Sequence, residues 1–165
     1  MRHFVVGSTG AALLLLCGCQ KTDAIADANK AINVITGDDQ QPASANSTCR
    51  MFSSTEAASY IGEPVGAPEN AAMGSGCAWP AKDGDGEVVI AIVPAADHEP
   101  PTGGEGFQKL ASPGTEGFAI PQLGGWVAGS IVGDKAIRVT VMGQTASEAT
   151  AAKLLTDVAA RIPAG

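Results

Sequence analysis

A tight connection between two apolar segments most constrains how this chain can fold. Residues 125–132 and 136–141 are rich in β-branched side chains, and Gly133-Asp134 stands between them. Gly at the first central position suits a type II′ turn, which needs a positive φ there and joins antiparallel strands. The two segments are therefore predicted to form an antiparallel hairpin.

Three further segments extend this hairpin into a sheet. Residues 76–80 and 87–93 flank two Asp-Gly steps, which favour a second hairpin, and residues 117–120 form another short apolar run. Within 136–141 apolar and polar side chains alternate, so one face of the sheet is expected in the core and the other in water. The pattern predicts about five strands in a mostly antiparallel sheet.

One helix is predicted before the strands in the sequence and a second helix after them. Ser53 and Glu56 form a capping box for a short helix that ends at Gly62. Thr145 with Glu148 suggests a second capping box, and an apolar stripe at helical spacing follows it. That stripe consists of Ala151, Leu154, Leu155, Val158 and Ile162. With the strands between them, the helices predict an α+β fold whose closing helix covers one face of the sheet. Residues 94–106 read as a surface loop, and 107–110 as a single helical turn.

The N-terminus has the layout of an export signal. Basic Arg2 precedes an apolar stretch over 4–16, and small Gly18 follows. The stretch is shorter than the roughly 20 apolar residues that cross a bilayer. Residues 1–18 are therefore expected to be removed on export.

Leu16-Cys17-Gly18-Cys19 resembles the lipobox of bacterial lipoproteins. The resemblance implies a thioether-linked diacylglycerol on Cys19, cleavage just before it, and often acylation, such as palmitoylation, of the new amine. Several acyl chains would hold the protein in the membrane permanently. Gln20, where Asp would favour retention in the inner membrane, implies the outer membrane facing the periplasm if the cell is Gram-negative. The alternative is an ordinary cleaved signal followed by a coincidental cysteine.

Under this resemblance two cysteines remain in the mature protein, Cys49 and Cys77. A single remaining pair in an exported chain is most simply a disulfide. Two free thiols or a redox pair are the alternatives, although the chain has no Cys-x-x-Cys motif.

The mature chain divides into a tether and one domain. Residues 19–48 are largely polar and small after a weak apolar periodicity at 23–36, and they are expected to lift the domain off the membrane. Residues 49–163 are long enough for one core of ordinary size. The periodic segment fits either a short amphipathic helix or loosely ordered chain.

The domain also resembles small bacterial lipoprotein domains of unknown function, known chiefly from actinobacteria. The matching residues are Cys49, Thr55-Glu56-Ala57-Ala58, Cys77-Ala78-Trp79 and the terminal helix. This resemblance implies the same disulfide and fold, and it implies no activity.

The charge and composition exclude some partners. The formal net charge is −7, and losing Arg2 with the signal makes it −8. An acidic surface repels nucleic acid, and an aromatic content of 4% leaves little for stacking bases or sugars. The expected membrane contact is therefore the lipid anchor, and no nucleic-acid partner is expected.

No catalytic or cofactor motif stands out. His98 is the only histidine after the signal, and no Gly-x-Ser-x-Gly turn presents a serine, so a solvated loop histidine is expected. Asp83, Asp85 and Glu87 resemble the first half of a calcium loop, but Val88 and Pro94 occupy places where the loop needs Gly and Glu. They are weak metal candidates only, and no cofactor is predicted.

Three other side chains are candidates for binding. Trp79 and Trp126 lie within predicted strands, where core packing is the simpler interpretation than a partner anchor. Arg138 is a lone cation on the wet face of its strand, where a carboxylate ligand or partner could use it. An ordinary surface charge is the alternative.

The sequence thus favours a lipid-anchored, non-catalytic module of the cell envelope that binds a protein partner or a small ligand. One alternative is a small envelope hydrolase whose carboxylates the sequence does not single out. Another is a structural or assembly accessory of an envelope complex.

Overall fold

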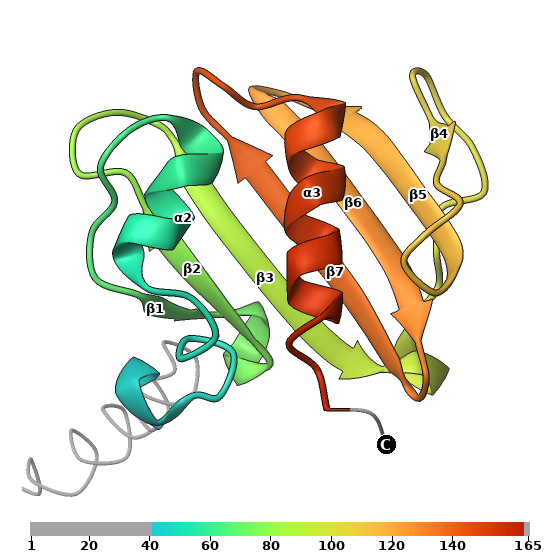
Figure 1. Cartoon of the computed structure of the whole chain (residues 1–165), viewed down its shortest axis with the longest axis horizontal. Coiled ribbons are helices and arrows are strands. Elements are labelled where there is room, and N and C mark those ends of the chain that lie inside the picture. Colours follow the sequence, from blue (N-terminus) through green and yellow to red (C-terminus); the bar gives the residue numbers. More distant parts are fainter. Residues whose placement is uncertain (1–40, 164–165) are drawn as a thin grey trace, which may run out of the picture. The chain divides into compact units, whose positions relative to one another are not determined.

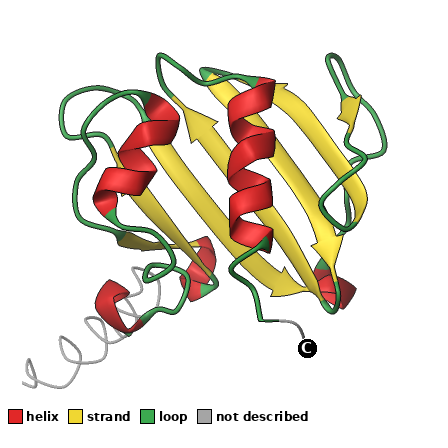
Figure 2. Cartoon of the chain, viewed as in Figure 1, coloured by secondary structure: helices red, strands yellow, loops and turns green. Residues whose placement is uncertain are grey.

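The computed structural model describes residues 41–163, which fold into one α+β domain. A seven-stranded antiparallel sheet forms one layer, in the order β1-β2-β3-β7-β6-β5-β4. Helices α2 (Ser54–Ile61) and α3 (Glu148–Ala159) form the other layer, in front of the sheet in Figures 1 and 2. The predicted α+β class and antiparallel sheet are confirmed.

Five of the strands are the predicted ones. They are β2 (Gly76–Pro80), β3 (Glu87–Pro94), β5 (Thr115–Gln122), β6 (Gly125–Val132) and β7 (Lys135–Met142). The tight turn between β6 and β7 has Gly133 at a φ of 61°, as its predicted turn type requires. The last strand in the sequence, β7, lies in the middle of the sheet, where it pairs with both β3 and β6.

Two short edge strands were not predicted, so the estimate of about five strands is too low. They are β1 (Glu69–Ala71) and β4 (Gln108–Lys109). The helical turn predicted at 107–110 is wrong, because Gln108 and Lys109 pair with Ala119 and Phe118 of β5. Runs this short carry no periodicity, so only the neighbouring strand specifies them.

Helix α2 follows its sequence signals closely. Ser53 accepts a hydrogen bond from the Glu56 amide and the Glu56 carboxylate accepts one from the Ser53 amide, so both halves of the capping box are present. Gly62 ends the helix with a φ of 75°, a left-handed conformation that favours glycine.

Helix α3 begins later than predicted. Its N-cap is Ser147, whose hydroxyl accepts from the Thr150 amide, so the predicted capping box of Thr145 and Glu148 is wrong. The Thr145 hydroxyl instead donates to the carbonyl oxygen of Tyr60 at 3.1 Å and links the start of α3 to the end of α2. Four members of the predicted stripe, Ala151, Leu154, Leu155 and Val158, are fully buried. The fifth, Ile162, lies beyond the end of the helix at Ala159 and is half-buried.

The core lies between the helices and one face of the sheet. Trp79, which is fully buried, packs edge-on against Phe52 with ring centroids 6.3 Å apart. Trp126 is half-buried at the edge of the same cluster. Both tryptophans therefore belong to the core, as their strand positions predicted.

Polar contacts join the outer surfaces of the two helices. The Tyr60 hydroxyl donates to the Asp157 carboxylate, which also receives Lys153 at 2.5 Å. Burial raises the pKa of Asp157, but the hydrogen bonds from Lys153 and Tyr60 outweigh it, so the pKa is lowered.

A second polar contact involves Arg161, beyond the end of α3. Its guanidinium lies 2.8 Å from the Glu56 carboxylate and over the ring of Phe52. The hydrogen bond from the Ser53 amide and that from Arg161 lower the pKa of Glu56 to about 2.

Residues just before Cys49 already pack on the domain. The Asn46 side chain donates to Asn70 Oδ1 and to the carbonyl oxygen of Gly76, each at 2.9 Å, and Thr48 is buried. The folded unit thus extends upstream of the expected boundary at Cys49. Residues 19–40 of the predicted tether lie outside the described residues.

The Cys49–Cys77 disulfide is present, with a Cα–Cα distance of 5.0 Å. Both cysteines are buried, and the bond attaches the segment before α2 to the second residue of β2. The predicted pairing is confirmed.

Replacing both Cys49 and Cys77 with serine will lower the free energy of unfolding by about 3–4 kcal/mol, because the bond closes a loop with a sequence separation of 28. Urea denaturation with and without reductant measures this difference. Reductant should destabilise the wild type and leave the double variant unchanged. Equal midpoints for the oxidised wild type and the variant would contradict the prediction.

Candidate functional site

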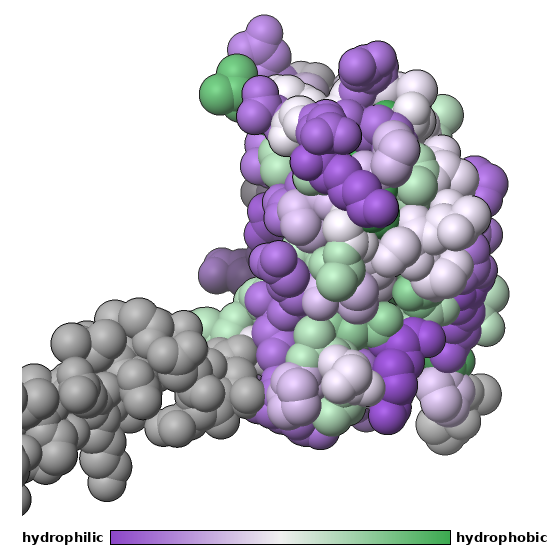
Figure 3. All heavy atoms as spheres, turned by 90° about the vertical axis from the view of Figure 1, so that its left-hand side faces the viewer, coloured by the Kyte–Doolittle hydropathy of each residue, from purple (hydrophilic) through white to green (hydrophobic). Residues whose placement is uncertain are grey.

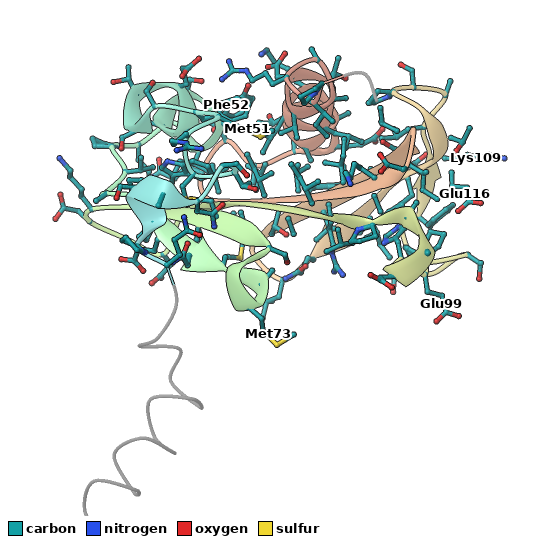
Figure 4. The ribbon with its side chains drawn as sticks, turned by 90° about the horizontal axis from the view of Figure 1, so that it is seen from below. Met51, Phe52, Met73, Glu99, Lys109 and Glu116 are labelled. Atoms are coloured by element: carbon teal, nitrogen blue, oxygen red, sulfur yellow. A yellow bond between two sulfur atoms is a disulfide. The ribbon has the colours of Figure 1, made fainter. Side chains whose placement is uncertain are left out.

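The two faces of the sheet have different surroundings. Seen edge-on in Figure 4, α2 and α3 both lie on one side, and neither covers the other side. Paired residues of an antiparallel ladder share a face, so the register assigns every second residue to this side. We call it the open face.

Part of the open face is covered by the chain's own loop. Phe118 is buried, and the rings of His98 and Phe107 each stack on it with centroids 6.5 Å away. His98 is half-buried there, so the prediction of a solvated loop histidine is wrong. The loop that contains His98 has no hydrophobic periodicity, so nothing in its residues predicts that it folds back on the sheet.

The rest of the open face forms a mixed apolar and polar surface at the centre of the sheet. Val89, Ala91 and Val93 of β3 are partly exposed, and the register places Thr140, Arg138 and Ala136 of β7 beside them. We call Val89, Ala91, Val93, Arg138 and Thr140 the open strip. Ala136 alternates with the core residues of β7, so it lies on the face that was predicted to be in water, but it is buried.

Arg138 is the charged residue of the open strip. It is exposed, and the register pairs it with Ala91 on one side and Gly129 on the other. A Cβ at Gly129 would lie 2.6 Å from the Phe118 ring, so the glycine makes room for that ring. Among residues 41–163 no side chain makes an ion pair or hydrogen bond with the guanidinium. The Phe118 ring fills the space at Gly129, whereas small Ala91 leaves the other flank of Arg138 accessible to a carboxylate.

Two carboxylates lie on the same face, beyond the open strip. Glu87 of β3 pairs with Met142, and Glu69 of β1 pairs with Ala78. Burial, and then the negative charge of Glu69, raise the pKa of Glu87. No cation is bonded to either carboxylate within the part of the chain that the structure describes.

Met73 projects on this side of the sheet as well. It is 96% exposed and lies in the turn between β1 and β2, with a φ of 51°. Figure 4 shows it below the sheet, as it does Glu99 near the opposite edge. These two side chains therefore lie at the margins of the open face.

The weak metal candidates are divided between two places. Asp83 and Asp85 lie in the loop between β2 and β3, where they line an open depression of about 640 Å³ with Glu63, whereas Glu87 lies on the sheet. Across residues 41–163 no group of three or more His, Cys, Asp or Glu side chains is arranged to hold a metal ion. The spacing of a half calcium loop therefore does not bring these three carboxylates together.

Other surfaces are less distinctive. The side that carries α2 and β1 is largely hydrophilic or intermediate in hydropathy, with scattered hydrophobic patches (Figure 3). Among the described helices none is long and apolar enough to cross a membrane. The predicted signal at 1–18 and the lipidation site Cys19 lie outside the described residues.

Comparisons with protein-family models, curated proteins and solved structures found no match to this chain. The resemblances to the lipobox and to small lipoprotein domains therefore stay predictions.

Glu87→Gln will raise the melting temperature at neutral pH. A folded-state pKa above the unfolded value of about 4.3 means that ionisation of Glu87 costs stability as the pH rises through the folded pKa. The advantage of the variant should shrink as the pH falls. Thermal unfolding at micromolar concentration, from neutral pH down toward the unfolded pKa of about 4.3, measures the difference in melting temperature. Glu99→Gln serves as the exposed-loop control. A gain of equal size at every pH would contradict the assignment.

Proposed function

We propose that this protein is a non-catalytic binding module of the cell envelope, anchored by lipid on Cys19, and that it binds a protein partner through the open face. The open strip is the observation that supports the open face as the binding surface. Its apolar residues on β3 lie beside an arginine that has no carboxylate partner among residues 41–163.

An uncovered sheet face suits a protein partner because two such faces pack about 10 Å apart with interdigitating side chains. The apolar residues Val89, Ala91 and Val93 would contribute burial, and Arg138 would contribute specificity. Arginine is favoured at interfaces because its planar guanidinium can bind a carboxylate with two hydrogen bonds.

The anchor rests on Leu16-Cys17-Gly18-Cys19 and the apolar stretch before it. Such an anchor keeps the module at the membrane surface, where tethering raises the local concentration of any partner held in the same membrane. Because the chain is acidic, anionic lipid headgroups would repel it, so electrostatic attraction would not replace the lipid anchor.

Cys19→Ser will abolish lipid attachment and leave the fold intact. Metabolic labelling with an alkyne-bearing palmitate and fractionation of the cell envelope measure attachment. Cys17→Ser is the matched control, because Cys17 leaves with the signal and the label should persist. Label retained by the Cys19 variant would contradict the anchor.

A photo-crosslinking phenylalanine derivative at Thr140, in the open strip, will give covalent adducts in living cells. The same derivative at Thr156, on the exposed side of α3, will not. Adding Arg138→Glu should remove the Thr140 adducts if Arg138 binds the partner. Equal adducts from both positions, or none from Thr140, would refute the open face as the binding surface.

A further inference from the structure

The open face carries both signs of charge, and neither is neutralised. Arg138 lacks a bonded anion and Glu87 lacks a bonded cation among residues 41–163. Glu87 also lies close enough to Glu69 for the two carboxylates to repel each other. A surface of this kind is complementary to one that carries the same charges in the opposite order.

The two charges do not meet within one copy. Arg138 pairs with Ala91, and Glu87 lies four residues from Ala91 along β3. At about 3.4 Å per residue the backbone positions are roughly 14 Å apart along the strands. Any direct contact between such groups therefore has to come from two different molecules.

We propose that a second copy of this chain packs on the open face about a two-fold axis, so that Arg138 of each copy faces Glu87 of the other. This inference rests on the proposed function, because it names the partner of the same surface. A two-fold interface is self-complementary: if Arg138 of one copy meets Glu87 of the other, the reverse contact forms as well.

The shape of the strip agrees with this arrangement. Val89, which is partly exposed, lies two residues from both Glu87 and Ala91 on β3, so it falls near the centre of the contact. Thr140 pairs with Val89 and is equally small. Sheets of such residues pack face to face with strand directions about 30° apart.

The projecting turn at Met73 does not obstruct this contact. It connects β1 to the Gly76 end of β2, and Gly76 is level with Ala91 and Arg138 in the register. Glu87 lies at the other end of β3, where Pro80 pairs with it. The contact extends from Arg138 toward Glu87, away from the Met73 turn, so that turn stays at the rim.

Sedimentation equilibrium of residues 19–165 carrying Cys19→Ser tests the proposal. The wild-type surface should give a concentration-dependent dimer. Arg138→Glu and Glu87→Arg should each weaken it at least tenfold, because each places like charges opposite each other twice. Lys82→Glu, an equal charge reversal in the β2–β3 loop, is the control and should leave the dimer unchanged.

An equimolar mixture of the Arg138→Glu and Glu87→Arg proteins should recover association, because each altered residue then faces an opposite charge. This rescue separates loss of contact from loss of folding. A wild-type chain that stays monomeric at the highest concentration reached overturns the proposal. A dimer that neither variant weakens, or a mixture that does not associate, also overturns it.

The crosslinks from Thr140 distinguish this proposal from the broader one. An adduct of twice the chain's mass supports self-association. An adduct with a different protein, together with a monomeric wild type, overturns self-association and leaves the open face as the binding surface. Absence of adducts specific to Thr140 overturns both.

Discussion

The eight-residue ladder between β3 and β7 holds the two halves of the sheet together. It pairs strands that are distant in the chain, so its formation has to offset the entropy of closing a long loop. Its register also decides which side chains share a face. Val88 and Ile90 join Val141 and Val139 beneath the helices, whereas Ala91 joins Arg138 on the opposite side. A slip of one residue would bury Arg138 and expose the valines.

The core that this ladder organises lies on one side of the sheet, and polar links close its margins. The disulfide joins Cys49 to β2 beside the buried Trp79. At the helix layer, Asp157 receives hydrogen bonds from Tyr60 of α2 and Lys153 of α3. The disulfide and the Tyr60–Asp157 hydrogen bond connect segments that are far apart in the chain, so the short α2 is held by more than its own helical hydrogen bonds.

On the other side, small residues determine what is accessible. Gly129 admits the Phe118 ring, which is covered in turn by His98 and Phe107, and Ala91 leaves the other flank of Arg138 open. Part of the open face is therefore filled by the chain's own loop. The remaining strip combines apolar side chains with charges that have no bonded partner in the described domain. The side that carries α2 is instead largely hydrophilic or intermediate in hydropathy, with scattered hydrophobic patches (Figure 3).

The sequence by itself determined the features that depend on local chemistry. The capping box of α2, its end at Gly62, the turn at Gly133 and the apolar stripe of α3 all follow from neighbouring residues. The pairing of Cys49 with Cys77 was predicted from the lipobox resemblance, which leaves these two cysteines in the mature chain. Only the tertiary structure decided the two edge strands and the packing of His98 on Phe118, because each depends on a neighbour outside its own segment. Ser147 caps α3 through the nearby Thr150 amide, but the Thr145 hydroxyl bonds to the Tyr60 carbonyl oxygen, 85 residues away. The same holds for the candidate site. The alternation of apolar and polar residues in β7 predicted that Arg138 lies on the wet face. Its neighbours Ala91 and Gly129, and its position relative to Glu87, depend on how β7 pairs with β3 and β6. That register joins distant segments, so the spacing of residues along the chain does not predict it.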